Sequence, residues 1–117
     1  EATAAYCRAV RSGQAIAVSG TAATAPDGSA LHPGDIYGQT REAFARAIDA
    51  VRALGGDVGD TVRTRLLLVP ESDWREAVRA HREVFEGVDP ANTTVFVAGF
   101  IPDGVLVEVE LDAWVDE

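Results

Sequence analysis

The sequence predicts an α+β domain in which two helices cover one face of a mixed β-sheet, with the elements in the order ββ-α-β-α-ββ. Two segments carry apolar residues at steps of three and four, as amphipathic helices do. The other apolar segments are short and alternate with polar residues, as strands do. The chain has 117 residues and no internal repeat, so we expect a single domain over residues 1–117.

The first two strands are predicted at residues 6–10 and 15–20, where β-compatible residues form short runs. The link at residues 11–14 contains a glycine, which is typical of a hairpin turn. Residues 21–34 are rich in small and turn residues. We expect this segment to be a surface excursion that can form the rim of a pocket.

The first helix is predicted between an N-cap at Asp35 and a stop at Gly55-Gly56. Its apolar stripe consists of Ile36, Thr40, Phe44, Ala47, Ile48, Val51 and Leu54. A strand follows at residues 61–69, and Pro70 ends it. Alternation along this strand places Val62, Thr64, Leu66 and Leu68 on one face and Arg63, Arg65, Leu67 and Val69 on the other.

The second helix is predicted from a cap at Ser72 to a stop at Gly87. Its apolar positions are Trp74, Val78, His81 and Phe85. Strands at residues 93–98 and 105–115 complete the sheet. The last strand has one apolar face, and its other face carries Leu106, Glu108, Glu110, Asp112 and Trp114.

One face of the predicted sheet has no helix to cover it, because two helices can cover only one face. That face combines carboxylates and arginines with Leu67, Val69 and Trp114. It is too apolar for open solvent and too charged for a dry core. A wet interface between subunits satisfies both requirements, so we predict a homo-oligomer.

Composition and charge exclude several classes of protein. Nineteen acidic and ten basic residues give a net charge of −9, which disfavours binding to nucleic acid or to a membrane surface. The chain has one cysteine, so an internal disulfide is impossible. We see neither a membrane-spanning run nor a signal peptide, and we therefore expect a cytoplasmic protein.

The acidic residues of the last strand are the first candidates for chemistry. Glu108, Glu110 and Asp112 lie on one side of the strand, where like charges raise one another's pKa unless they are paired. One of them in a partly buried cleft could act as a general base. Alternatively, they pair with Arg63 and Arg65 across the subunit interface, which we favour for Glu110 and Asp112.

The other reactive residue types give weaker signals. His81 is interpreted as a buried structural histidine, and Cys7, in a short strand, as an inert small hydrophobe. Ser19 lacks the motif of a hydrolase nucleophile, although its hydroxyl could line a pocket. Two histidines and one cysteine make no metal pattern, so we expect no metal. Composition and spacing alone indicate no reaction.

Seven short motifs, in order along the chain, resemble the reactive-intermediate deaminase superfamily (Rid, or YjgF-like; older label endoribonuclease L-PSP). They are Tyr6-Cys-Arg-Ala-Val10, Ala17-Val-Ser-Gly20, Gln39-Thr40-Arg41, Leu54-Gly-Gly-Asp-Val-Gly-Asp-Thr-Val-Arg-Thr64, Asp73-Trp74, Pro90-Ala91-Asn92-Thr93 and Val107-Glu-Val-Glu110. Each motif alone is weak, but their order and spacing together are specific, and they span nearly the whole chain.

The resemblance implies a chorismate-mutase-like fold assembled as a homotrimer, with three clefts between subunits. It also implies hydrolysis of reactive imines and enamines, such as 2-aminoacrylate, without a cofactor or metal. By position, Glu108 matches the glutamate that holds the attacking water. The matching pocket positions for a small metabolite are Tyr6, Ser19, Gly20, Trp74 and Thr94, although for Trp74 simple core packing is nearly as good an explanation.

Asn92 departs from the pattern, because the imine deaminases have an arginine there that grips the substrate carboxylate. An asparagine amide can bind a carbonyl or hydroxyl but cannot neutralise a carboxylate. The site could therefore hydrolyse a different imine, enamine or related carbonyl compound, with little 2-aminoacrylate deaminase activity. Alternatively, another arginine (Arg8, Arg63 or Arg65 of a neighbouring subunit) replaces the anchor, or the trimer only binds or regulates. Ribonuclease activity is disfavoured by the charge.

Overall fold

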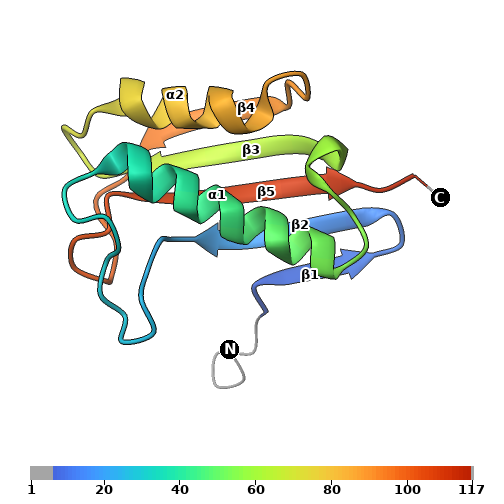
Figure 1. Cartoon of the computed structure of the whole chain (residues 1–117), viewed down its shortest axis with the longest axis horizontal. Coiled ribbons are helices and arrows are strands. Elements are labelled where there is room, and N and C mark those ends of the chain that lie inside the picture. Colours follow the sequence, from blue (N-terminus) through green and yellow to red (C-terminus); the bar gives the residue numbers. More distant parts are fainter. Residues whose placement is uncertain (1–6, 117) are drawn as a thin grey trace.

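The computed structural model describes residues 7–116, and its elements follow the predicted order (Figure 1). The strands are β1 (Ala9–Ser12), β2 (Ala15–Thr21), β3 (Thr61–Leu68), β4 (Ala91–Phe96) and β5 (Val107–Trp114). The helices are α1 (Ile36–Ala53) and α2 (Trp74–Phe85), with a short 3₁₀ helix, η2 (Val58–Asp60), before β3. The α+β prediction is confirmed.

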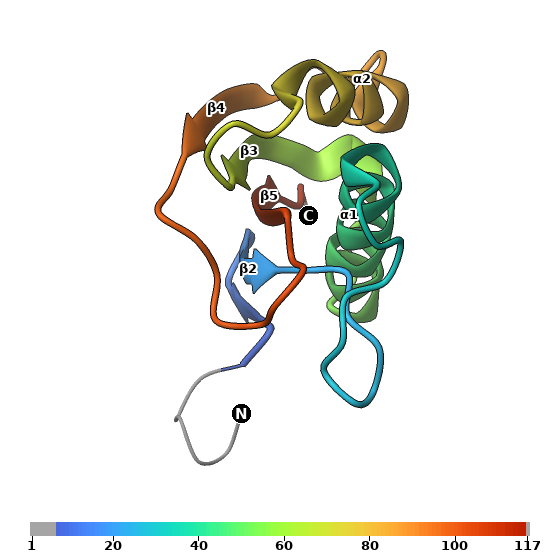
Figure 2. The same ribbon diagram turned by 90° about the vertical axis from the view of Figure 1, so that its left-hand side faces the viewer.

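The five strands form one mixed sheet in the order β1-β2-β5-β3-β4. β4 runs parallel to β3, and every other neighbouring pair is antiparallel. The crossover through α2 makes the parallel pairing possible. Figure 2 shows α1 and α2 on the same side of the sheet. Within residues 7–116 the opposite face has no helical cover, and we call it the open face.

The hydrophobic core lies between the two helices and the other face of the sheet, the covered face. Alternate residues of β5 point into this core and are buried, namely Val107, Val109, Leu111 and Ala113. From α1, Phe44 and Val51 are fully buried against them. Fully burying one such side chain contributes roughly 1.5–3 kcal/mol, so the apolar face of β5 has to be the covered one.

The alternation predicted for β3 is wrong at its first residues. A strict alternation puts Val62 on the covered face with Thr64, but 51% of the Val62 surface is exposed. The pairing of β3 with β5 shifts register between Thr61 and Arg63. One extra residue is accommodated there as a β-bulge, which changes the face of the side chains before it. From Thr64 onward the predicted faces are correct.

The helix ends are predicted correctly except at the start of α2. Asp35 caps α1 by accepting a hydrogen bond from the Gly38 backbone N–H. Ser72 does not cap α2: the cap residue is Asp73, which makes no side-chain cap bond. The Ser72 hydroxyl instead donates to the Val69 carbonyl at 2.8 Å. Gly87 follows the last turn with φ of +85°, a conformation that favours glycine.

The strand boundaries differ from the prediction by a few residues. β1 starts at Ala9 and reaches Ser12, so the turn is the two-residue loop 13–14. Cys7 therefore precedes the strand, and it is exposed. β4 starts at Ala91, two residues early, because it pairs with β3 from Arg63 onward. In the part of the chain that the structure describes, no helix has the length and hydrophobicity to cross a membrane.

Candidate active site

Glu108 lies on the open face of the sheet, in the middle of the strand order. Its neighbours Val107 and Val109 point into the core, so its own side chain points away from the helices. The residue is half-buried, and within residues 7–116 its carboxylate has no hydrogen-bond or ion-pair partner. Burial, and to a lesser extent the nearby charge of Glu110, raises the pKa of Glu108 above its usual value. This carboxylate is suited to take up a proton.

Gly20 lies beside the Glu108 carboxylate. It lies in the irregular part of β2, where the pairing with β5 shifts between Val18 and Thr21. A Cβ atom on Gly20 would be 2.6 Å from Oε1 of Glu108, closer than such atoms come in proteins. The absence of a side chain at Gly20 therefore gives the carboxylate its place. The structure brings these two predicted residues together.

Ser19 lies beside Gly20, but its hydroxyl is engaged with the backbone before β1. It donates to the Arg8 carbonyl at 3.0 Å, and the Arg8 guanidinium donates to the Thr21 hydroxyl at 3.2 Å. Ser19 is thus exposed at the rim and tied to the segment that leads into β1. The predicted pocket residue Tyr6 lies outside the described residues.

The other two acids of β5 have partners. Arg65 on β3 lies 3.2 Å from the Glu110 carboxylate and 3.8 Å from that of Asp112. The predicted pairing is confirmed for Arg65, but it needs no interface, because all three residues belong to one copy of the chain. Arg63 makes no ion pair in the described residues. Because Glu110 and Asp112 are paired with Arg65, Glu108 is the one acid of β5 that has no cation beside it in the described residues.

Asn92 and Thr94 form a polar cluster with Thr64 on the covered face of the sheet. Asn92 and Thr64 are paired across β4 and β3, and the Asn92 amide Nδ2 donates to the Thr64 hydroxyl at 3.0 Å. The Thr94 hydroxyl donates to Oδ1 of Asn92 at 2.7 Å. β4 is the edge strand, so Asn92 remains exposed at the margin of the sheet.

Thr94 also lines an apolar groove between β4 and α2. The groove has a volume of about 280 Å³ and is lined by Leu68, Trp74, Val78, Thr94, Val95 and Phe96. Trp74 is 42% exposed, and the guanidinium of Arg75 lies 4.6 Å from its ring centre. Trp74 thus lines a surface groove and is not simply a core residue.

The predicted site residues form two groups that do not meet in one copy. Ser19, Gly20 and Glu108 belong to the open face, whereas Asn92 and Thr94 share the covered face with Thr64 and Leu66. The sheet itself separates the two groups. A cleft that contains both must therefore be formed by two copies of the chain.

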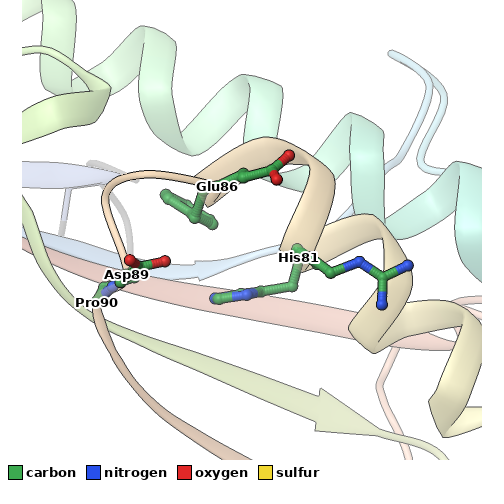
Figure 3. A pocket seen from close by; sticks show the side chains of 6 residues that line it. His81, Glu86, Asp89 and Pro90 are labelled. Atoms are coloured by element: carbon green, nitrogen blue, oxygen red, sulfur yellow. The ribbon is translucent and has the colours of Figure 1, made fainter.

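Sequence reasoning missed Thr64 and misjudged His81. The His81 ring packs between Phe44 and Phe85, but it is only half-buried, and its Nε2 lies 2.7 Å from the Thr64 hydroxyl. The ring also borders a larger hollow of about 470 Å³ (Figure 3). The sequence signal that could have indicated Thr64 is a hydroxyl residue at one of the otherwise apolar, covered positions of residues 61–69.

The described residues offer no obvious place for a metal ion. Within residues 7–116, no three His, Cys, Asp or Glu side chains are grouped as ligands. Glu108 and Asn92 are also separated by the sheet. A metal site built from these residues would need more than one copy of the chain.

Comparison with known proteins identifies related chains. Residues 1–115 match the protein family described as Endoribonuclease L-PSP. An uncharacterized protein of Streptomyces coelicolor is 40% identical over 93% of this chain and 81% of its own length. The 2-iminobutanoate/2-iminopropanoate deaminase of Mus musculus is 29% identical over 90% of this chain and 77% of its own length.

The fold has close matches among solved structures. A member of the YjgF/YER057c/UK114 family from Mycobacterium tuberculosis superposes with a TM-score of 0.86 at 36% sequence identity. The superposition covers 98% of this chain and 91% of that one. The YjgF-like fold predicted from the sequence motifs is therefore confirmed.

Glu108→Gln is expected to stabilise the fold at neutral pH. Because the folded-state pKa of Glu108 is raised, the native state holds more protons than the unfolded state between the two pKa values. The free energy of unfolding therefore falls as pH rises through that window. We expect the substitution to raise the Tm at pH 7 by on the order of 2 °C and to have no effect below pH 4, measured by calorimetry at one protein concentration.

Glu110→Gln is the matched control, because it removes a carboxylate that is paired with Arg65. It should bring no gain in Tm at pH 7. An equal gain in Tm for the two variants, or a lower Tm for Glu108→Gln, would contradict the assignment of a raised pKa to Glu108.

Proposed function

The chain belongs to the endoribonuclease L-PSP (Rid, YjgF-like) family, and we propose that it hydrolyses a small imine, enamine or related carbonyl compound without a cofactor. The observation that carries this proposal is the state of Glu108: half-buried, without a cation beside it in the described residues, and with a raised pKa. Its relatives include proteins named 2-iminobutanoate/2-iminopropanoate deaminase. The net charge of −9 argues against RNA as the substrate.

The proposed reaction uses Glu108 first as a base and then as an acid. Glu108 accepts a proton from a water molecule as the water oxygen bonds to the imine carbon, and the C=N electron pair moves to nitrogen. Glu108 then returns the proton to that nitrogen, which gives the neutral carbinolamine. Glu108 takes the hydroxyl proton and delivers it to the nitrogen as the C–N bond breaks, so that ammonia leaves and the carbonyl product remains. A pKa raised toward neutrality suits a group with both tasks.

The proposed site lies between two subunits of a homotrimer. Glu108 and Gly20 would come from the open face of one copy, and Asn92, Thr94 and the groove beside Trp74 from the edge of the next. Two features support this assembly: the two groups lie on opposite faces of the sheet, and apolar side chains such as Trp114 are exposed on the open face. A trimer closed around an axis would bring the two groups of residues together and would cover the exposed apolar side chains.

Asn92 is proposed to set the substrate preference. Its amide is neutral and is already bonded to Thr64 and Thr94, so it cannot replace a guanidinium that binds a carboxylate in a charge-assisted fork. Arg65 is engaged with Glu110 and Asp112 in its own copy. We therefore expect weak or no activity on 2-aminoacrylate, the enamine tautomer of 2-iminopropanoate, and a preference for compounds with an uncharged group at this position.

Ammonia release from freshly generated 2-aminoacrylate tests the role of Asn92. The wild-type protein should release little ammonia above the uncatalysed rate, and Asn92→Arg should increase the rate at least about tenfold, because a charged partner for the carboxylate is restored. Adding Glu108→Gln to Asn92→Arg should abolish that gain.

Efficient wild-type turnover of 2-aminoacrylate would contradict the assigned preference. Full activity of the Glu108→Gln protein on any imine would contradict the proposed role of Glu108. Binding of a metabolite without turnover of any imine by the wild-type protein would instead favour a trimer that only binds.

Gly20→Ala should reduce turnover by displacing the Glu108 carboxylate. The added methyl would lie 2.6 Å from Oε1, so the carboxylate has to move by about 1 Å, a displacement that can lower kcat roughly ten- to a hundred-fold. The assay is ammonia release in the Asn92→Arg background. Gly59→Ala is the control, since a Cβ there meets nothing within 4 Å; equal activity of the two variants would show that the close approach of Gly20 is immaterial.

A further inference from the structure

A continuous line of hydrogen bonds joins the edge strand to α2. It runs from the Thr94 hydroxyl to Oδ1 of Asn92 at 2.7 Å, and from Nδ2 of Asn92 to the Thr64 hydroxyl at 3.0 Å. It continues from the Thr64 hydroxyl to Nε2 of His81 at 2.7 Å. Thr64 is fully buried, so its hydroxyl depends on these two neighbours.

The tautomer of His81 is linked to the direction of the whole line. Because Nδ2 of Asn92 donates to the buried Thr64 hydroxyl, the hydroxyl proton has Nε2 of His81 as its acceptor, and this requires a neutral ring with its proton on Nδ1. The Thr64 hydroxyl oxygen can then only accept from Asn92, and the Thr64 carbonyl accepts from the same Nδ2 at 3.4 Å, so both select the NH₂ end of the amide. Oδ1 is left facing Thr94, which donates to it. Each bond in the line thus has one donor and one acceptor.

Protonation of His81 removes this constraint. Nε2 then carries a proton and donates to Thr64, whose own hydroxyl proton becomes available to Asn92. The amide can then bond both hydroxyls after a half-turn, with Oδ1 toward Thr64 and Nδ2 toward Thr94, because each hydroxyl can donate or accept. The turn gives up the 3.4 Å hydrogen bond from Nδ2 to the Thr64 carbonyl. The order of donor and acceptor along the exposed edge is then reversed.

The surroundings of His81 favour the neutral ring. Phe44 and Phe85 pack against it, and burial lowers its pKa below 6.5. The charged groups on the adjoining hollow are Arg82 and Glu86 of α2 and Asp89 of the loop that follows. Figure 3 shows the ring pointing toward Asp89 and Pro90, but none of these groups makes an ion pair with it in the described residues.

We propose that His81 is a positioning residue that acts through Thr64 to fix which way round the Asn92 amide is presented to the cleft, and that protonating His81 lets the amide turn over. The consequence of this positioning for the substrate rests on the proposed function. The site would select an uncharged substrate group whose hydrogen-bond donor and acceptor match the fixed Asn92 amide. Substrate binding would weaken as His81 becomes protonated. The hydrogen-bond line itself does not depend on any reaction.

The side chain of Asn92 can be observed alone, because it is the only asparagine in the chain. In protein labelled with ¹⁵N-asparagine, the one side-chain NH₂ pair should shift with pH. We expect its midpoint to coincide with that of the His81 ring, below pH 6.5. His32→Gln should leave this transition unchanged, His81→Gln and Thr64→Val should remove it, and Thr64→Ser should retain it.

Two results would overturn the proposal. The Asn92 signals could stay constant while the His81 ring titrates in the wild-type protein, a result that requires no variant to fold. They could also titrate unchanged in a folded Thr64→Val protein. Both readouts are made without substrate, so a failure of the proposed hydrolysis leaves them intact, and their failure leaves the roles of Glu108 and Gly20 untouched.

Discussion

The alternation of side chains across the β-sheet is the constraint on which the site depends. Successive residues of a strand point to opposite faces, and burial of Val107, Val109 and Leu111 commits one face of β5 to the core. Glu108 is thereby held on the open face. The pairing of Asn92 with Thr64 holds the amide on the covered face. If Glu108 and Asn92 serve one substrate molecule, as we propose, a second copy of the chain has to bring them together.

Each of these two places has an unusual feature. At Glu108, a carboxylate is half-buried with no cation beside it among residues 7–116, which costs stability, whereas Glu110 and Asp112 on the same strand share Arg65. At Asn92, an exposed edge is linked through buried Thr64 to a histidine between two aromatic rings. Neither feature strengthens the core. Both are what a site needs when it must move a proton and recognise an uncharged group.

Periodicity predicts the order of the elements, both helices and the covered face, because burial enforces it along each element. It fails at Val62, where a bulge changes the alternation, and at Ser72, whose hydroxyl bonds Val69 and not the helix. Such deviations depend on pairing partners far away in the chain. The link between His81 and Thr64 joins residues 17 positions apart on different elements, so no local pattern indicates it. Similarly, the contact of Gly20 with Glu108 depends on the sheet register.

The most direct test of a site shared between copies is to mix two proteins that cannot form it alone. Wild-type protein and the Asn92→Arg/Glu108→Gln double variant are denatured, combined in equal amounts and refolded together, and ammonia release from 2-aminoacrylate is measured. Because the proposed site takes its glutamate from one copy and its arginine from another, the account predicts that the mixture reaches about one quarter of the activity of Asn92→Arg alone. Activity that stays at the average of the two separate proteins would place the site within one copy and contradict the account.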